Sequence, residues 1–153
     1  MVDFEQFDKQ VNTEELAKEV ENTPEYSEIK KGTYILGLDK MELKLTKAGD
    51  KVMFSVQCNI KEGKEKGRKL FFNRTLSGST SEKWTDGMAI KSVVTWVNEL
   101  IGEDGTPIRF INYSDFAEQI LDAFQELQNS VEVEIEYKAN DFNPITIKEV
   151  FDI

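Results

Sequence analysis

Cationic and aromatic side chains lie close together between residues 61 and 74. Segment 61–69 contains two glycines and carries five basic against two acidic side chains, and Phe71 comes two residues after it. Single-stranded nucleic acid is bound by cations that follow its backbone and by flat rings on which its bases stack, at about 1–3 kcal/mol per base. The residue types therefore predict contacts to phosphates and to a base. A solvated hairpin tip is the alternative for the charges alone.

The strand expected around Phe71 decides which side chains accompany it. Leu70 and Phe72 have the parity of core residues, so Phe71 faces outward and is expected to stack on a base. A second core aromatic under a loop or helix, or a dimer contact, is the alternative for Phe71. Arg74 has inward parity, but a strand end that twists outward would bring it to a phosphate. The predicted DNA-binding residues are Lys51, Met53, Lys61, Lys64, Lys66, Arg68, Lys69, Phe71, Asn73, Arg74 and Trp84.

The net charge of −10 conceals an uneven distribution. Residues 1–29 hold nine acidic and two basic side chains, a net −7, and residues 75–153 hold fifteen acidic and five basic ones, a net −10. Between them, residues 30–74 hold twelve basic and five acidic side chains, a net +7. Salt screens charges beyond about 8–10 Å, so a basic block acts locally whatever the total. The block therefore favours nucleic acid, which the total charge alone would disfavour.

Catalytic chemistry has few candidates in this chain. Histidine is absent and Cys58 is the single cysteine. Zinc sites built from Cys and His, His-dependent triads and histidine general bases are therefore excluded. No glycine-rich phosphate loop and no convincing cluster of acidic metal ligands occurs. We expect a non-catalytic protein without a metal or cofactor, and a carboxylate-only metal enzyme is the weakest alternative.

Length and composition predict one folded cytoplasmic domain. A chain of 153 residues with 39% hydrophobic and 31% charged residues suits a single globule with a proper core. No run of about 18 apolar residues occurs, and the acidic start lacks the regions of a signal peptide. Cys58 falls on the inward side of a strand and has no partner for an internal disulfide, which is typical of a reducing cytoplasm.

Three consecutive strands are expected in the centre of the chain, at residues 33–46, 52–60 and 69–76. In the first, apolar residues fall on even positions up to Leu38 and on odd positions from Met41. This change of parity predicts an extra residue, a β-bulge that bends the strand near Gly37, where no Cβ is present. Two long hairpins with a bent first strand suggest a sheet curved enough to close into a small barrel.

The rest of the chain predicts two helices and two further strands. One helix begins after Asp86 and ends before Gly102, and a second begins after Ser114. Trp84 precedes the first helix in a polar loop, where it either stacks on a base or anchors the loop. Trp96 is expected on the exposed side of that helix, toward a partner subunit or the barrel rim. Alternating residues predict the last strands at 131–138 and 145–153.

The N-terminal residues 3–21 have the apolar spacing of an amphipathic helix, or of two short helices with a break near Asn12 and Thr13. The favoured interpretation is a helix packed on the barrel. The alternative is a mobile acidic arm that covers the basic block until nucleic acid displaces it.

The order of elements is strand, strand, strand, helical segment, strand, strand. A mainly β (α+β) five-stranded barrel with its helical insert after strand three is the OB-fold, whose second and third strands form the usual oligonucleotide-binding face. The basic block coincides with those strands. We expect one OB-fold-like domain over 1–153, composed of an N-terminal helical arm 1–24, strands at 30–76, helices at 86–129 and strands at 131–153.

Three short motifs lie in residues 30–76: Gly-x-Tyr at 32–34, Thr-Lys-x-Gly at 46–49 and Gly-x-x-x-Gly-Arg-Lys-x-Phe at 63–71. With them this third of the chain resembles a phage-encoded family of predicted single-stranded DNA-binding proteins. The resemblance implies an OB-like fold that serves phage replication or recombination in the host cytoplasm, and it favours Arg68, Lys69 and Phe71 as contacts. Bacterial single-stranded DNA-binding proteins end in a flexible acidic tail with a terminal Pro-Phe. This chain ends in an expected strand, so recruitment by such a tail is not predicted.

We therefore expect a sequence-tolerant single-stranded DNA-binding protein acting in replication or recombination. A homodimer or larger oligomer is expected, with replication and recombination proteins as further candidate partners and no membrane. A second hypothesis is an acidic protein-interaction module, whose acidic helices and the row Glu132, Glu134 and Glu136 bind a basic host protein or imitate DNA to inhibit a nuclease.

Overall fold

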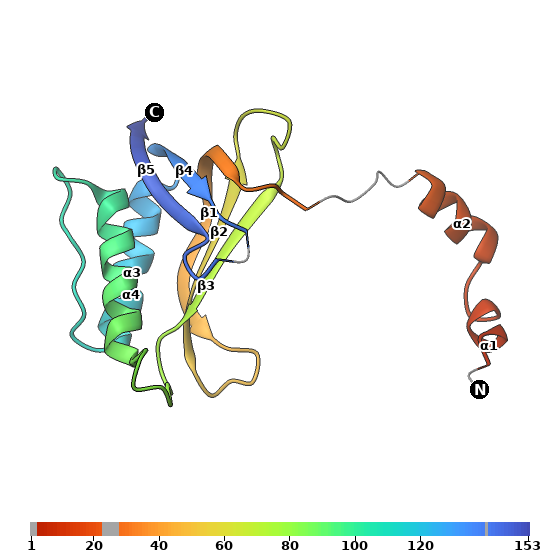
Figure 1. Ribbon diagram of the computed structural model, residues 1–153, viewed down its shortest axis with the longest axis horizontal. Coiled ribbons are helices and arrows are strands. Elements are labelled where there is room, and N and C mark those ends of the chain that lie inside the picture. The colour runs from red at the N-terminus through yellow and green to blue at the C-terminus, as the bar shows by residue number, and fades with distance from the viewer. Residues whose placement is uncertain (1–2, 23–27, 140) are drawn as a thin grey trace.

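The computed structural model describes residues 3–22, 28–139 and 141–153, and in this part the chain forms an α+β fold of four helices and five strands (Figure 1). The elements are α1 (Glu5–Asp8), α2 (Thr13–Asn22), β1 (Gly32–Leu45), β2 (Val52–Ile60), β3 (Lys69–Thr75), α3 (Asp86–Ile101), α4 (Tyr113–Leu127), β4 (Val131–Tyr137) and β5 (Ile145–Asp152). Among these described helices, none combines the length and apolar character needed to span a membrane.

The five strands form one antiparallel sheet in the order β3-β2-β1-β4-β5. β1 pairs with two neighbours, using residues 32–36 against β4 and residues 36–45 against β2. Its pairing with β2 shifts between Leu38 and Lys40, which makes Asp39 the extra residue. The predicted bulge is therefore confirmed, and it bends the strand that both halves of the sheet share.

The helices α3 and α4 cover one face of the sheet, as Figure 1 shows. Each is buried along a single stripe at helical spacing, which includes Val93 and Val97 in α3 and Phe116 and Ile120 in α4. These side chains meet the inward residues of the strands, such as Phe54, in one hydrophobic core. The core therefore lies between the sheet and the helix pair, and the opposite face of β1, β2 and β3 is left without a helix over it.

The edge strands β3 and β5 are joined by side chains rather than by a backbone ladder. In the described residues no ladder closes the sheet, so the predicted barrel is not confirmed. Trp96 of α3 spans the opening: its ring stacks on Phe72 of β3 with centroids 5.7 Å apart, and its Nε1 donates to the carbonyl oxygen of Ile145 in β5 at 3.1 Å. The prediction that Trp96 is exposed was wrong, because α3 turns this ring toward the open side of the sheet.

The ends of α3 follow the local sequence. The N-cap is Thr85, whose side chain accepts a hydrogen bond from the backbone N–H of Met88 at 3.2 Å. Asp86, the expected cap, instead accepts from the backbone N–H of Ser79 at 3.0 Å and holds the preceding loop. Gly102 ends the helix with a φ of 76°, a left-handed value that suits glycine, as predicted.

The N-terminal helices do not pack on the sheet. Every residue from 3 to 22 is exposed, and neither α1 nor α2 has a buried side chain. Figure 1 shows both helices away from the sheet. The break between them near Asn12 is confirmed, whereas the prediction of a helix packed on the sheet was wrong. The inner face of the sheet is already covered by α3 and α4.

Candidate nucleic-acid interface

The face of β1, β2 and β3 that lies opposite the helices presents a continuous set of polar and cationic side chains. Strand register places Phe71, Gln57 and Lys40 in one row across the three strands, and Asn73, Ser55 and Glu42 in the next. We call this surface the outer face and define it by Lys40, Glu42, Lys44, Met53, Ser55, Gln57, Asn59, Lys69, Phe71, Asn73 and Thr75. Five of the residues predicted to bind DNA lie on it or border it, namely Met53, Lys61, Lys69, Phe71 and Asn73.

Phe71 is the aromatic side chain of the outer face and lies on the edge strand β3. Its side chain is 57% exposed, whereas its neighbours Leu70 and Phe72 are each 3% exposed and belong to the core. The predicted outward orientation of Phe71 is therefore confirmed, and the alternative of a second core aromatic is excluded. An exposed ring set among cations and amides offers a base a flat surface on which to stack.

Asp39, the bulged residue of β1, lies against the cationic end of the outer face. Its carboxylate accepts from Lys69 Nζ at 2.6 Å and from the side-chain amides of Asn59 at 2.5 Å and Gln57 at 3.4 Å. Burial alone would raise the pKa of Asp39, but the hydrogen bonds and the Lys69 charge outweigh it and hold the pKa below its ordinary value of 3.8. Ionised Asp39 therefore stabilises the fold above that ordinary value, and the contribution is lost as the pH falls through the lower, folded-state pKa.

Replacing Asp39 by Asn is expected to strengthen binding of single-stranded DNA about threefold at low salt. The change removes a negative charge and frees Lys69 for a phosphate, and one unit charge about 7 Å from a phosphate contributes about 0.6 kcal/mol in water. Fluorescence anisotropy with oligo-dT measures the effect. The matched control is Asp122→Asn on the exposed surface of α4, which should leave affinity unchanged. If Asp39→Asn and Asp122→Asn bind oligo-dT with equal affinity, Lys69 does not contact the DNA.

Lys61 reaches the outer face because Gly37 has no side chain. A Cβ built on Gly37 would collide with Lys61 Cε, and the same position lies 3.3 Å from Asn59 Nδ2. The Lys61 stem therefore lies across Gly37, beside the cluster of Asp39 and Lys69. Gly37, which was predicted at the bend of β1, therefore also leaves room for the Lys61 side chain.

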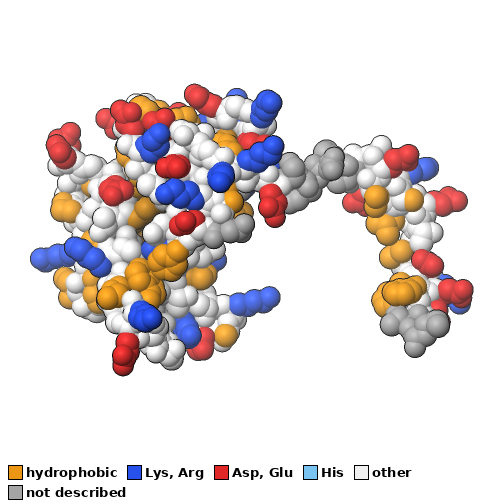
Figure 2. All heavy atoms as spheres, in the orientation of Figure 1, with side chains coloured by type: hydrophobic (Ala, Val, Ile, Leu, Met, Phe, Trp, Pro, Cys, Tyr) orange, Lys and Arg blue, Asp and Glu red, His pale blue; other side chains and the backbone are white. Residues whose placement is uncertain are grey.

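The loop 61–68 carries the other predicted cations beyond the end of the outer face. Two glycines with positive φ shape it, Gly63 at 85° and Gly67 at 87°. Lys64 and Lys66 are exposed, whereas Arg68 donates to Glu65 Oε2 at 2.5 Å. Figure 2 shows Lys and Arg side chains projecting from the hairpin tips. The loop thus extends the cationic surface past the last residues of β2 and β3.

Arg74 lies inside the protein rather than on the outer face. Its side chain is 6% exposed and donates to Ser92 Oγ and the Phe142 carbonyl oxygen, each at 2.7 Å, and to Asn143 Oδ1 at 2.9 Å. The guanidinium also lies 4.3 Å from the centroid of the Phe142 ring, and burial lowers its pKa. The prediction that Arg74 twists outward to a phosphate was therefore wrong. Arg74 shares the parity of the core residues Leu70 and Phe72, and this parity correctly indicated an inward side chain.

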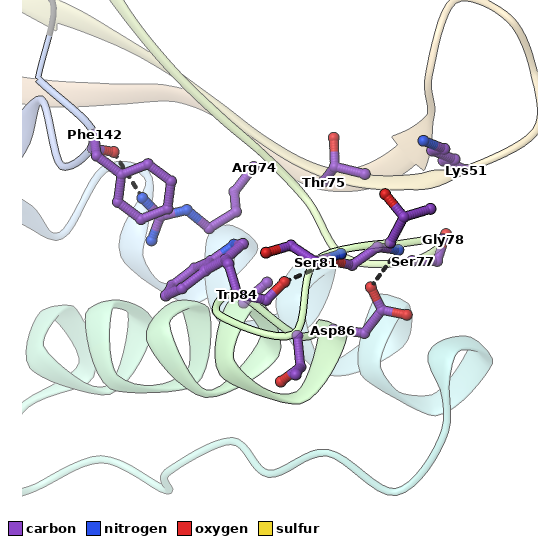
Figure 3. A pocket seen from close by; sticks show the side chains of 13 residues that line it. Lys51, Arg74, Thr75, Ser77, Gly78, Ser81, Trp84, Asp86 and Phe142 are labelled. Atoms are coloured by element: carbon purple, nitrogen blue, oxygen red, sulfur yellow. Dashed lines mark hydrogen bonds between the residues drawn. The ribbon is translucent and has the colours of Figure 1, made fainter.

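Trp84 and Lys51 border a pocket at the end of β3, shown in Figure 3. The pocket has a volume of about 390 Å³ and is lined mainly by hydroxyl-bearing residues of the loop 77–85. Trp84 packs edge-to-face on Phe142 with centroids 4.7 Å apart, and its carbonyl oxygen accepts from Ser79 Oγ at 2.5 Å. Of the two roles considered for Trp84, these contacts favour anchoring the loop. Lys51 lies close to Gly78, so it sits at this pocket and not on the outer face.

Two cations of the outer face escaped the sequence argument. Lys40 lies beside Gln57 and pairs with Glu42 at 3.3 Å, and Lys44 lies beside Met53. The sequence contains the signal that would have identified them. After the bulge the apolar residues of β1 fall on odd positions, so its even positions face outward. Applying that parity to the polar residues of β1 would have found both lysines.

Two features bear on reactive chemistry in the described residues. Within them, no three His, Cys, Asp or Glu side chains are grouped so that they could hold a metal ion. Cys58 is 1% exposed, and burial, helped by the charge of Asp39, raises the pKa of its thiol to about 12. A thiol with that pKa is protonated and unreactive at neutral pH.

Comparison with known proteins identifies one family. Residues 13–151 match the family described as "Protein of unknown function (DUF669)". The matched region contains α2, α3, α4, the strands β1 to β4 and β5 up to Phe151, and therefore includes the outer face. Among curated proteins, none matches the sequence. Since the match covers nearly the whole chain, the protein belongs to the DUF669 family.

Proposed function

We propose that this protein binds single-stranded DNA through the outer face and the loop 61–68, without sequence specificity and without catalysis. The observation that carries the proposal is Phe71, a ring that is 57% exposed on the edge strand β3 of a face that also carries Lys40, Lys44 and Lys69. Bases stack on such a ring while the lysines follow the phosphates. Side-chain amides at Gln57, Asn59 and Asn73 add donors and acceptors that any base can use.

The arrangement of the strands supports an OB-type fold for this function. β1 pairs with β2 through one half and with β4 through the other, and the helical segment lies between β3 and β4. In OB-folds the face of strands two and three receives oligonucleotides. Here the outer face occupies that position, and the side chains of α3 span the side on which β3 and β5 are not paired.

The proposed role is to protect or present single strands during replication or recombination, in the cytoplasm and as a homodimer or larger assembly. A stacking surface favours single strands because the bases of a duplex are already stacked on one another. The edge strand β3 carries Phe71 and Asn73, so a single strand of DNA could lie along β3 without meeting a helix of the described residues.

Binding to oligo-dT is expected to weaken steeply with salt. Phosphate contacts release counterions from the strand, and log K falls with log salt by about 0.7 per contact. About five contacts would therefore lower affinity by about 100-fold between 50 and 200 mM salt. Fluorescence anisotropy of a labelled 35-nucleotide oligo-dT, with duplex of equal length as competitor, measures this. Weak binding without salt dependence, or full competition by duplex, would reject the proposal.

A second candidate function is supported by the acidic arm, residues 3–22. All of these residues are exposed, and they carry seven acidic and two basic side chains. Such a segment suits an interaction module that binds a basic protein or imitates DNA. Absence of oligo-dT binding at low salt, together with recovery of a host protein in a nuclease-treated pull-down, would favour this function.

A further inference from the structure

The acidic arm exposes an apolar stripe that is available for a partner surface. Its large hydrophobic side chains are between 48% and 72% exposed: Phe4, Phe7, Val11, Leu16 and Val20. Figure 2 shows hydrophobic side chains gathered along one side of the two helices, with acidic ones on the other. Helices of four and ten residues are marginal in water and depend on packing of their apolar side. The arm therefore gains stability when this stripe is covered.

Charge indicates which surface of this protein fits the arm. The arm has a net charge of −5, from seven acidic and two basic side chains. The outer face with Asp39 and the loop 61–68 has seven basic and four acidic side chains, a net charge of +3. The outer face combines lysines with the exposed ring of Phe71. A helix with an apolar stripe and acidic flanks matches a surface that presents an exposed aromatic ring and lysines.

The covalent connection allows the arm to reach the outer face. Nine residues separate the end of α2 from the start of β1, and a connection of this length spans up to about 30 Å. The chain enters β1 beside the cationic loop. A cavity of about 510 Å³ at this point is lined on one side by Lys30, Thr33 and Tyr34 and on the other by Glu62 and Lys64. The nine residues of β2 are about 30 Å long, so the tether is comparable with the length of the face.

We propose that residues 3–22 bind the outer face of their own chain, with the apolar stripe over Phe71 and the acidic side chains against the lysines of the face and the loop 61–68. Single-stranded DNA then competes with the arm for the same surface. The competition rests on the proposed function, whereas the contact between arm and face does not. A tethered segment competes at an effective concentration in the millimolar range, so even a weak contact lowers the apparent affinity for DNA.

A paramagnetic label tests the contact directly in the full-length chain. Gln10→Cys places a nitroxide on the arm, and buried Cys58 does not react with it. In the ¹⁵N-labelled protein we expect selective broadening of the backbone amides of Lys69, Phe71 and Asn73. Oligo-dT should reverse it. Mixing spin-labelled ¹⁴N protein with unlabelled ¹⁵N protein should show no broadening, because the contact is within one chain.

The paired variant Leu16→Ser with Val20→Ser removes the apolar stripe of α2. It should abolish the broadening and raise affinity for oligo-dT about three- to tenfold. The sheet and the helices α3 and α4 should stay folded, since neither residue belongs to the hydrophobic core. The control variant Gln6→Ser with Asn22→Ser changes polar residues of the same arm and should alter neither signal. No higher affinity in the stripe variant would overturn the competition.

The remaining outcomes separate the two proposals. DNA binding without broadening of the outer face would overturn the arm contact and leave the proposed function standing. Broadening that also appears in the mixed sample would place the arm on a second copy and reject contact within one chain. Broadening that persists in a protein unable to bind oligo-dT would reject the proposed function and the competition, and would establish the arm contact alone.

Discussion

Replacing Phe71 by Ala is expected to weaken binding of oligo-dT by about 5- to 100-fold, without lowering Tm. The loss corresponds to one stacked base, which contributes about 1–3 kcal/mol. Stability should hold because the ring is 57% exposed and Leu70 and Phe72, its neighbours in β3, supply the core contacts. Phe71→Trp should retain or increase affinity, since an indole offers a larger stacking surface. Anisotropy at fixed salt and thermal unfolding followed by circular dichroism measure the two effects.

The matched control for Phe71 is another partly exposed phenylalanine on an edge strand. Phe151 of β5 is 37% exposed and lies outside the outer face. Phe151→Ala should leave affinity for oligo-dT unchanged. Equal losses in the two variants would indicate a general effect on the sheet, and no loss in Phe71→Ala would remove base stacking from the mechanism.

The central strands could be predicted because their signals are local. The alternation in β2 and β3 assigned Phe71 to the exposed side, and the change of parity between Leu38 and Met41 located the bulge. Both inferences depend only on the two-residue period of a strand and on one inserted residue. The same rule, applied to the polar residues of β1, also places Lys40 and Lys44 on the outer face.

The side-chain contacts at the open side of the sheet, between β3 and β5, could not be predicted in the same way. Trp96 bonds to β5 across 49 residues of sequence, and Arg74 reaches the turn before β5 across 68 and 69 residues. Helical spacing showed which side of α3 is apolar, but not that the sheet stays open beside it. Composition likewise could not show that Asp39 pairs with Lys69, a contact that reduces the free positive charge of the face.

Replacing Arg74 by Met is expected to destabilise the fold by about 2–4 kcal/mol, because three partly buried hydrogen bonds and the contact of the guanidinium with the Phe142 ring are lost. The carbonyl oxygen of Phe142, Asn143 Oδ1 and Ser92 Oγ each receive a hydrogen bond from the guanidinium. A hydrogen bond to a charged group contributes about 1.5–3 kcal/mol, and the loss is partly offset because water reaches the exposed Phe142 and Asn143 and because the buried charge is removed as well. In a domain of this size the loss lowers Tm by about 5–15 °C. Urea unfolding gives the free energy directly.

The control for charge is Lys44→Met, which removes one exposed cation from the outer face and should leave stability within about 0.5 kcal/mol. The two variants should also differ in their affinity for oligo-dT. Below its lowered Tm, Arg74→Met should bind oligo-dT with unchanged affinity, because its guanidinium is turned toward α3 and the β4–β5 turn. Lys44→Met should lose affinity with little change in stability.

Should Arg74→Met fail to fold, Arg74→Lys keeps the charge and part of the hydrogen bonding, and should show a smaller loss of stability and unchanged binding. Weaker binding by a folded Arg74 variant would mean that this side chain leaves the interior when DNA binds.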